Sequence, residues 1–293
     1  MSPTICFHHN DEDGRASAAI IRHALGDELT LIEMDYDDLA IPWDVVARAQ
    51  QVIVVDFSFP TQDMQNLAAG RKFIWIDHHV SALTELGEVS RDWPGSRDLS
   101  DAACVLTWKY FFPGQPVPRA ITLIGDRDVW RWAEADTGAF TESLHVRDTR
   151  ADNDALWVPL LKEDPVIMKN ILDEGQRLRE IRLAEIKERV DRRGFEVEFE
   201  GHRTLVINAP GNGDLGQRGR DLGYEIVYCY EDQMQRDTLT TNVTLFSRQA
   251  DVSVIARRHG GGGHTNAAGF SFPRTSTPFP PEANVKWLRE EPR

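Results

Sequence analysis

Residues 73–79 read Phe73-Ile74-Trp75-Ile76-Asp77-His78-His79, an apolar run that ends abruptly in one carboxylate and two imidazoles. The branched and aromatic side chains of this run predict a buried β-strand. Packing gives such a strand no reason to end in Asp-His-His. In open α/β sheets, however, ligands bind beyond the carboxyl ends of the strands. The stretch therefore predicts both a sheet and a functional site at its edge.

Two further apolar runs end in the same way. Residues 4–7 run into His8-His9-Asn10-Asp11-Glu12-Asp13-Gly14, and residues 52–55 run into Asp56-Phe57-Ser58. Three predicted strands thus deliver aspartate and histidine side chains to one rim of a sheet.

Strand-like and helix-like segments alternate through the first 80 residues, with short connections. Residues 16–25, for example, predict a helix that leads to a second strand at 29–34. This alternation is typical of a parallel sheet with helices on both faces. Residues 166–193 form the longest helical pattern. Beyond Gly194 the apolar residues recur with a period of two, which is typical of strands.

We therefore expect an α/β protein of three parts: an N-terminal parallel-sheet domain at residues 1–164, a connecting helix at 165–194, and a smaller C-terminal α/β domain at 195–293. Residues 81–99 have a weak pattern and are expected to form a loop. Residues 118–124 predict a helix leading into Gly125-Asp126-Arg127-Asp128, where acidic residues again follow an apolar run.

The composition disfavours several classes of protein. The 293 residues include 33 basic and 47 acidic side chains, a net charge of -14. A surface that binds long nucleic acid is not expected, because such binding depends on neutralising phosphates. The three cysteines are far apart and form no Cys-x-x-Cys pair, so we expect buried thiols. No apolar run reaches the roughly 18 residues of a membrane span. No leader peptide is recognisable, and we expect a cytoplasmic protein.

The acidic and imidazole side chains at the predicted strand ends form a candidate metal site. Clustered carboxylates repel one another unless protons or cations neutralise them. Oxygen ligands mixed with imidazole, without thiolates, suit Mn²⁺, Mg²⁺ or Fe²⁺ better than structural zinc. Two such ions roughly 3.5–4 Å apart would activate a water and stabilise both oxygens of a phosphoryl displacement. The candidate residues are His9, Asp11, Asp13, Asp56, Asp77, His78, His79 and Asp126.

Each piece of this site has a structural alternative when it is taken alone. Residues 11–14 could form a turn and a helix N-cap, and Asp56 could be a cap at a strand end. His78 and His79 could be one packed and one solvated histidine. Asp126 could cap a helix or pair with a neighbouring arginine. The occurrence of all these motifs in order, each after an apolar run, favours the metal site.

A glycine-rich segment near the C-terminus is a second candidate site. Its glycines expose backbone N–H groups that can bind an anion, and arginine and histidine side chains flank them. A flexible hairpin loop is the alternative, although it does not explain the flanking basic residues. The candidate substrate-binding residues are Arg257, Arg258, Gly261, Gly262, Gly263, His264 and Asn266.

Together these motifs resemble the DHH phosphoesterase superfamily, in the subgroup with a C-terminal DHHA1 domain. Residues 9–14 resemble the first motif, Asp56-Phe57-Ser58 the second, Asp77-His78-His79 the third and Asp126 the fourth. Residues 261–269, which begin with Gly-Gly-Gly-His, resemble the DHHA1 signature. The Asn-Asp-x-Asp-Gly and Asp-x-Asp-x-Trp forms resemble the nanoRNase/oligoribonuclease and cyclic-nucleotide phosphodiesterases of the superfamily.

The resemblance implies a DHH catalytic domain, a DHHA1 substrate-binding domain and an active site in the cleft between them. It also implies two Mn²⁺ ions, with Mg²⁺ or another divalent metal as alternatives. One ion would be held by His9, Asp11 and Asp56, and the other by Asp13, Asp56, His78 and Asp126. Asp77 would orient a ligand histidine. His79 would contact the scissile phosphate or assist the leaving oxygen.

Two departures from the family pattern lie in the DHHA1 part. Thr244-Leu245-Phe246-Ser247 replaces a Ser-Leu-Arg-Ser run, so Phe246 stands where the family often has arginine, with Arg248 close by. Phe246 could stack a base, as in single-stranded nucleic-acid binding, or simply pack in the sheet. Residues 211–214 stand where a serine-containing loop often occurs. Both departures leave the substrate preference open.

The resemblance implies a hydrolase, namely a two-metal, manganese-dependent phosphodiesterase that cleaves very short oligonucleotides to 5′-mononucleotides, as an exonuclease acting on nanoRNA. One alternative is a phosphodiesterase of cyclic mononucleotides or of cyclic or linear dinucleotide signals, or a nucleoside bisphosphate phosphatase. A second is a non-catalytic nucleotide-sensing module. The expected partner is a short oligonucleotide or nucleotide, with no long nucleic acid and no membrane. The oligomeric state stays open, with a homodimer as one alternative.

Overall fold

The computed structural model describes residues 4–26, 28–36, 38–235 and 237–288. The chain forms two compact units, Met1–Arg179 (unit 1) and Glu180–Arg293 (unit 2). Helix α9 (Pro165–Arg193) contributes residues to both. The ends of the expected domains, residues 1–3 and 289–293, lie outside the described residues.

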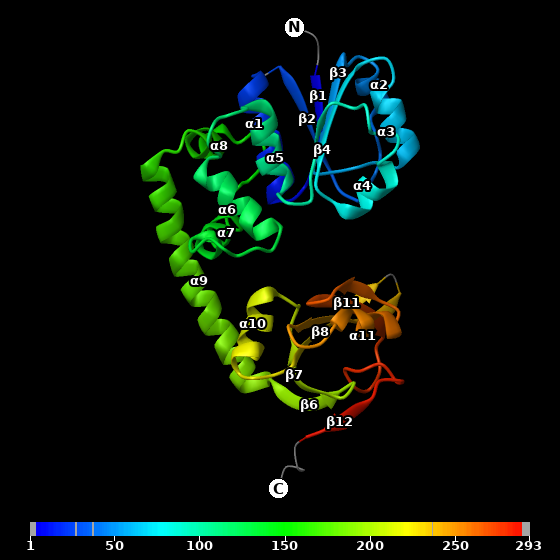
Figure 1. Cartoon of the computed structure of the whole chain (residues 1–293). Helices are drawn as coiled ribbons and strands as arrows, with labels where there is room; N and C mark the ends of the chain where they lie inside the picture. The colour runs from blue at the N-terminus through cyan, green and yellow to red at the C-terminus, as the bar shows by residue number, and fades with distance from the viewer. Residues whose placement is uncertain (1–3, 27, 37, 236, 289–293) are drawn as a thin grey trace. The chain divides into compact units, whose positions relative to one another are not determined.

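A five-stranded parallel sheet is the framework of unit 1 (Figure 1), with the strand order β2-β1-β3-β4-β5. From β1 the chain adds β2 on one side and β3, β4 and β5 on the other, so the strand order switches between the neighbours β1 and β3. Parallel sheets bind ligands at such a switch point, outside the carboxyl ends of the strands. The strands are β1 (Thr4–His9), β2 (Leu29–Met34), β3 (Gln51–Val55), β4 (Lys72–Asp77) and β5 (Gly95–Arg97).

Helices cover both faces of this sheet because side chains alternate along each strand. Cys6 and Ile53 belong to the core on the face of α1 and α5, whereas Phe7 and Val54 belong to the core on the face of α2, α3 and α4. Figure 1 shows these two groups of helices on opposite sides of the strands. The helices of unit 1 before α9 are α1 (Glu12–Leu25), α2 (Trp43–Val46), α3 (Thr61–Ala68), α4 (Val80–Leu86), α5 (Ala103–Phe111), α6 (Arg119–Asp128), α7 (Thr137–Leu144) and α8 (Asp154–Leu161).

The stretch at residues 81–99, expected to be a loop, instead contains most of α4 and the whole of strand β5. Strand β5 has only three residues, Gly-Ser-Arg, which lack the branched and aromatic side chains that mark strands. Gly95 has φ +137°, and a Cβ there would lie 1.8 Å from the carbonyl oxygen of Trp75. The strand therefore forms through close backbone approach to β4, which a hydrophobic pattern does not reveal.

Unit 2 is built on a seven-stranded sheet with the order β10-β11-β9-β8-β7-β6-β12. Neighbouring strands are antiparallel except for β7 and β8, which are parallel. The core on one face includes Leu215 of α10, and the core on the other includes Ile255 of α11. The elements are β6 (Phe195–Phe199), β7 (His202–Asn208), α10 (Gly213–Asp221), β8 (Ile226–Gln235), β9 (Thr238–Ser247), α11 (Val252–Arg258), β10 (Gly262–His264), β11 (Ala267–Pro273) and β12 (Val285–Trp287).

Helix α10 was not predicted, because three of its nine residues are glycine, which disfavours helices. One of them, Gly216, has a steric reason. A Cβ at this position would lie 2.7 Å from the ring of Phe246 on β9. The helix can therefore pack closely on the sheet only with glycine here.

The predicted fold class is confirmed: an N-terminal parallel sheet with helices on both faces, a long helix, and a smaller C-terminal α/β unit. All three cysteines are buried free thiols. None of the helices that the structure describes combines the length and the apolar character that crossing a membrane requires.

Candidate metal centre

The first ligand group stands where β1 ends and α1 begins. Asp11 is the N-cap of α1, and its Oδ1 accepts a hydrogen bond from the backbone N–H of Gly14 at 2.9 Å. Its other oxygen, Oδ2, lies 2.9 Å from Nδ1 of His9. A Cβ at Gly14 would lie 2.4 Å from the His9 carbonyl oxygen, so glycine lets the helix start this close to the strand. Asp11 therefore caps the helix with one oxygen and faces the imidazole with the other.

Asp56 follows β3 and lies between two imidazoles. Its Oδ2 is 3.8 Å from Nδ1 of His9, and its Oδ1 is 3.3 Å from Nε2 of His78. The side chain is 1% exposed. The backbone has φ +52°, a left-handed conformation that aspartate adopts more readily than most residues. This turn directs the carboxylate back over the end of the sheet.

His78 follows β4 and faces three carboxylates. Its Nε2 lies 3.3 Å from Oδ1 of Asp56, 3.5 Å from Oδ2 of Asp13 and 3.3 Å from Oδ2 of Asp128. The Asp13 carboxylate also accepts hydrogen bonds from the first backbone N–H groups of α5, those of Ala103 and Cys104, at 2.8 and 2.7 Å. The start of α5 therefore holds Asp13 in place beside His78.

Asp77, the last residue of β4, is fully buried and orients the following histidines. Its Oδ1 accepts hydrogen bonds from the backbone N–H groups of His78 and His79, at 2.7 and 3.0 Å. The same oxygen lies 2.8 Å from Nδ1 of His79, which therefore donates to it. This hydrogen bond raises the pKa of His79, while burial opposes the shift. Asp77 thus fixes the ring of His79 directly and His78 through its backbone.

Asp126 is not among the side chains that gather around His78. Its carboxylate accepts hydrogen bonds from the backbone N–H groups of Ala133 and Glu134, at 2.9 and 3.2 Å, and from the hydroxyl of Thr137, at 2.5 Å. Burial acts to raise the pKa of Asp126, but these hydrogen bonds leave it below its usual value. Asp126 organises the chain between α6 and α7.

Asp128 stands beside His78 instead, although the motif resemblance did not point to it as a ligand. Both aspartates lie in the last turn of α6. Asp128 comes four residues after Ile124 and seven after Ile121, which is the spacing of one helix face. Continuing the helical pattern of these buried residues by one turn would have pointed to Asp128.

The donor atoms of this cluster fit divalent cations. Buried polar atoms normally have hydrogen-bond partners. Among the described residues, the exceptions include both carboxylate oxygens of Asp56, Nε2 of His78 and Nδ1 of His9, all at this centre. Nδ1 of His9 is close to Asp11 but does not form a hydrogen bond with it. Three sets have ligand atoms within 4.8 Å of one another, namely His9-Asp11-Asp56, Asp56-His78-His79 and Asp13-His78-Asp128. Unpaired oxygen and imidazole nitrogen atoms that converge in this way suit a hard divalent ion.

The pKa values of Asp13, Asp56 and Asp128 are raised, so these carboxylates hold protons more tightly than usual. Burial also acts to raise the pKa of Asp11, but the neighbouring His9 and a backbone hydrogen bond leave it below its usual value. Burial, followed by the charges of Asp13 and Asp11, raises the pKa of Asp56 well above its ordinary value. The same causes raise the pKa of Asp128 to about 8. Without a cation, protons must therefore relieve the repulsion among these groups near neutral pH. Binding a cation would displace those protons.

The predicted substrate-binding residues of unit 2 lie at the β10–β11 hairpin and at the end of α11. Gly261 and Gly263 have packing reasons to be glycine, because a Cβ would lie 2.0 Å from the Gly269 carbonyl oxygen and 2.6 Å from Cα of Ala268, respectively. Gly262 has open space around it. His264 and Asn266 are exposed on the hairpin, and Arg257 and Arg258 are exposed at the end of α11. Arg258 lies 3.3 Å from Glu200.

Phe246 is buried against α10, with 7% of its surface exposed. Of the two alternatives for this residue, sheet packing is the one that the structure contains. Phe246 therefore contributes to a close contact between β9 and α10.

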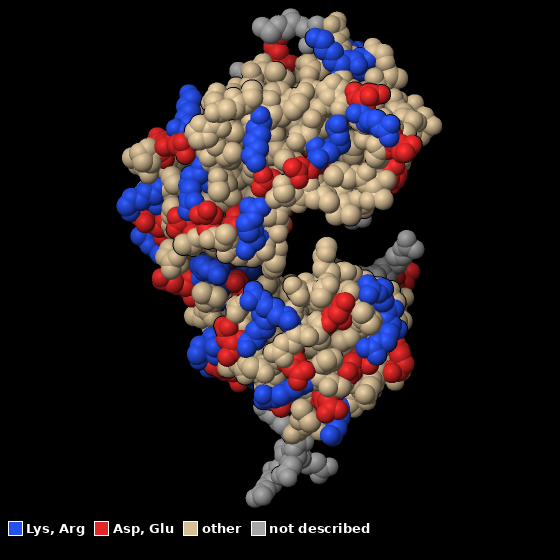
Figure 2. All heavy atoms as spheres, viewed as in Figure 1, with Lys and Arg blue, Asp and Glu red and all other residues tan. Residues whose placement is uncertain are grey.

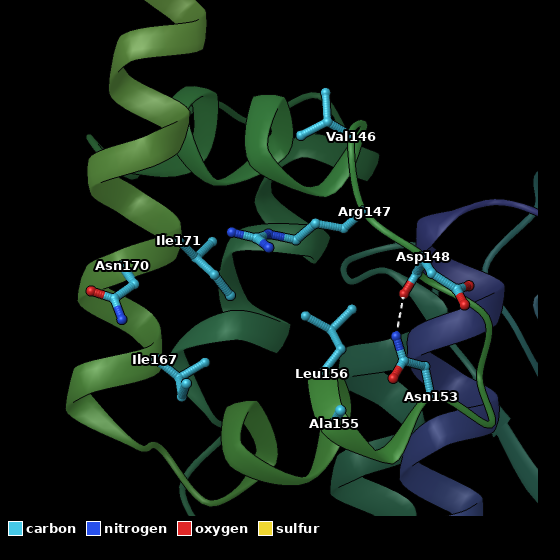
Figure 3. A pocket seen from close by; sticks show the side chains of 9 residues that line it. All are labelled: Val146, Arg147, Asp148, Asn153, Ala155, Leu156, Ile167, Asn170 and Ile171. Carbon is cyan, nitrogen blue, oxygen red and sulfur yellow. Dashed lines mark hydrogen bonds between the residues drawn. The ribbon is translucent and has the colours of Figure 1, made fainter.

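A separate hollow of about 510 Å³ lies in unit 1 (Figure 3). The guanidinium of Arg147, which lines it, is paired with Glu174 and donates to Ser143. None of the candidate metal ligands lines this hollow. It is lined by Val146, Arg147, Asp148, Asn153, Ala155, Leu156, Ile167, Asn170 and Ile171.

Comparisons with known proteins give one sequence relative and several similar folds. No family model matches the chain. An uncharacterized protein of Acanthamoeba polyphaga mimivirus is 27% identical over 290 residues, which cover 92% of this chain and 67% of that protein. The pGpG-specific phosphodiesterase PggH from Vibrio cholerae aligns with a TM-score of 0.54 at 13% identity, over 92% of this chain and 93% of that one. The DHH domain of PF0399, a member of the s1p family of ribosomal proteins, aligns with a TM-score of 0.50 at 16% identity, over 92% and 82%. At these identities the two structures establish a shared fold.

Proposed function

Because the chain has the DHH fold that its motifs predicted, we propose that it is a metal-dependent phosphodiesterase acting on very short oligonucleotides. The observation that carries this proposal is the set of unpaired, buried oxygen and nitrogen atoms around Asp56. Leaving such atoms without partners is costly for a folded protein. A site that binds divalent cations accounts for that cost.

We assign the ligands by their positions in the cluster. His9, Asp11 and Asp56 would hold one Mn²⁺, and the other would be held by Asp13, Asp56, His78 and Asp128. Asp56 fits the bridging role, because its two oxygens face different imidazoles. Asp128 takes the place that the motif resemblance gave to Asp126. Two divalent ions at such a site supply a nucleophilic water and stabilise the charge of a phosphoryl displacement.

His79 is the group we assign to the leaving oxygen. Its Nδ1 is held by Asp77, so its Nε2 is the end that can meet a substrate. The raised pKa of His79 favours the protonated ring. A protonated Nε2 within hydrogen-bond reach can donate its proton to the departing oxygen. Asp77 stabilises that protonated state and keeps the ring oriented.

The proposed substrate is a linear oligonucleotide of a few residues, cleaved to 5′-mononucleotides. The similar fold of PggH, whose name specifies the linear dinucleotide pGpG, supports this size class. Figure 2 shows basic and acidic side chains interleaved on the faces in view, without a continuous basic band there. With a net charge of -14, this favours a small ligand over long nucleic acid. The remaining candidates are cyclic mono- and dinucleotides and nucleoside bisphosphates, and non-catalytic nucleotide sensing.

The same proposal assigns binding of the rest of the substrate to unit 2. Arg257, Arg258 and His264 offer positive or hydrogen-bonding groups, and Gly262 is an exposed glycine of the hairpin with space around it. We expect His264→Ala to raise KM about tenfold with little change in kcat, as loss of one charge-assisted contact predicts. Unchanged kinetics would remove His264 from the site.

A product assay tests the function. Di- to decanucleotides of RNA and DNA, cyclic mono- and dinucleotides and a nucleoside bisphosphate are incubated with the protein and Mn²⁺, and the products are separated. Release of 5′-mononucleotides, fastest from the shortest linear chains, is the expected result. The double variant Asp77→Ala/His78→Ala serves as the inactive control. Tight nucleotide binding without turnover would replace the enzyme by a sensing module.

A further inference from the structure

Two exposed tryptophans follow the metal cluster directly in the chain. The segment between α6 and α7 (Figure 1) contains Trp130 and Trp132, which are 56% and 39% exposed. Tryptophan can bury a large apolar area and is enriched at interfaces. Two of them within three residues form a concentrated apolar feature on a charged protein.

Both tryptophans have a strained backbone. Trp130 has φ +56° and Trp132 has φ +52°, in the left-handed region that residues with bulky side chains normally avoid. Burial of the rings does not compensate this strain, because both rings are accessible. Strained residues that persist in a fold tend to be found at ligand-binding and catalytic sites.

Asp126 imposes this conformation. Its carbonyl oxygen accepts hydrogen bonds from the backbone N–H groups of Arg131 and Trp132, at 2.9 and 3.3 Å. Its carboxylate accepts three more, from residues 133, 134 and 137. The guanidinium of Arg131, between the two tryptophans, donates to the carbonyl oxygen of Ser100 at 2.7 Å. The loop is therefore tethered on both sides, so the two rings are presented by a fixed backbone.

The rings form a corner. Their centroids are 5.3 Å apart and their planes meet at 88°. A flat aromatic ligand can stack on one ring while its edge meets the other, which are the two favourable arrangements for aromatic pairs. Nucleobases are flat aromatic groups, and stacking on tryptophan binds them with little dependence on sequence.

The corner is close to the reacting centre. Trp130 and Trp132 are two and four residues beyond Asp128, whose carboxylate lies 3.3 Å from Nε2 of His78. Even a fully extended chain would put their Cα atoms within about 7 and 14 Å of that of Asp128.

We propose that Trp130 and Trp132 bind a nucleobase of the substrate and select nucleotides over inorganic phosphate compounds. This inference rests on the proposed phosphodiesterase function and adds the source of its specificity. Asp126 is a positioning residue for the corner. The site recognises the base by stacking, so it accepts purines and pyrimidines and requires only that a base be present.

The test compares substrates with and without a base. The variants Trp130→Leu, Trp132→Leu and Trp130→Phe are assayed with Mn²⁺ on a dinucleotide and on the same compound with one abasic residue at either end. Each leucine variant should lower kcat/KM about tenfold on the full dinucleotide. It should change kcat/KM less than about twofold on one of the abasic compounds. The variant Trp130→Phe should keep most of the wild-type kcat/KM on the full dinucleotide.

Trp287→Leu is the matched control. Trp287 is also 57% exposed, and it lies on β12, at the opposite edge of the unit 2 sheet from the glycine-rich hairpin. This variant should retain full activity on every substrate. Equal losses on full and abasic compounds, or no loss, would overturn the assignment and point to a protein-binding or structural role for the two rings.

A binding measurement separates this inference from the proposed function. Calorimetric titration of the Mn²⁺-loaded protein with 5′-AMP and with ribose 5-phosphate needs no turnover. The wild type should prefer AMP, and the preference should shrink about tenfold in the Trp130→Leu/Trp132→Leu variant. If the wild type hydrolyses no substrate but its preference for AMP shrinks in the double variant, the proposed phosphodiesterase function is wrong and the base-binding site is supported. If the preference is the same in both proteins, the base site fails.

Discussion

Asp56 shows how a single residue can favour cation binding while it lowers the stability of the metal-free folded state. It is buried, its backbone has φ +52°, and neither carboxylate oxygen has a hydrogen-bond partner. Asp13, Asp11 and Asp128 add like charge around it. Each of these features disfavours the metal-free folded state, and a shared cation relieves all but the backbone strain.

Asp56→Asn should therefore abolish activity without unfolding the protein. We expect at least a 100-fold loss of kcat/KM, because the bridging ligand is removed. In EDTA the melting temperature should stay equal or rise, since asparagine is neutral without having to take up a proton. Mn²⁺ titration and thermal melts of the variant measure both effects. Wild-type affinity for Mn²⁺ would contradict the bridging role.

Asp128 and Asp126 form a matched pair of variants. Asp128→Asn should weaken Mn²⁺ binding at least tenfold, because its oxygen faces His78. Asp126→Asn should keep Mn²⁺ binding but lower stability by about 1–3 kcal/mol, because buried hydrogen bonds to the α6–α7 chain are lost. Metal titration and urea unfolding of both variants check this. The reverse pattern would restore Asp126 as the ligand.

The metal-free protein should lose stability as the pH rises. The pKa of Asp128 is raised to about 8 in the folded state, above its unfolded value of about 4. Its contribution is therefore fully present below pH 4 and is lost as the pH rises through 8. In EDTA we expect the melting temperature to fall between about pH 5 and pH 8, by about 2–4 °C per kcal/mol. The fall should be smaller in Asp128→Asn, and an equal fall would assign the effect to other groups.

At the scale of elements, the β10–β11 hairpin contains glycines with different roles. Gly263 has φ +135°, and its Cβ would lie 2.6 Å from Cα of Ala268. Gly262 has no atom within 4 Å of the corresponding position. Only the first of these therefore needs glycine for packing, and the second is free to serve a ligand.

Alanine variants separate these roles. Gly263→Ala should lower stability by about 1–3 kcal/mol, because both the backbone conformation and the packing are disturbed. Gly262→Ala should leave stability within about 0.5 kcal/mol and raise KM if its N–H binds the substrate. Urea unfolding and steady-state kinetics measure the two effects. Equal stability losses would mean that both glycines are structural.

At the scale of the whole molecule, the proposed metal ligands are confined to one of the two units. All the proposed metal ligands, from His9 to Asp128, lie in unit 1. Unit 2 has its own sheet and its own cores on both faces. A ligand that binds only the folded form of one unit stabilises that unit by mass action.

Calorimetry of the full chain should show this division. We expect Mn²⁺ to raise the unfolding temperature of unit 1 by several degrees while a second transition, from unit 2, stays in place. At a free concentration 100 times the dissociation constant, the added stability is about 2.7 kcal/mol. Asp56→Asn should abolish the shift. A single transition that moves as a whole would mean that the units unfold together.

The sequence alone predicted the central strands of unit 1 and the candidate ligands at their ends, although it missed β5 and α10. Apolar runs followed by Asp and His predicted β1, β3 and β4, and brought His9, Asp56 and His78 to one edge. This works because parallel strands present their carboxyl ends on the same side of a sheet, so order along the chain becomes proximity in space.

Tertiary structure alone places Asp128, and not Asp126, beside His78. Two residues apart on a helix, their side chains point about 160° away from each other, so only one can face His78. The packing of α6 against unit 1 selects Asp128, while Asp126 turns to the loop that presents Trp130 and Trp132. The sequence motif does not show which of the two aspartates faces His78. The direction of each side chain depends on its position around the helix and on the surface against which the helix packs.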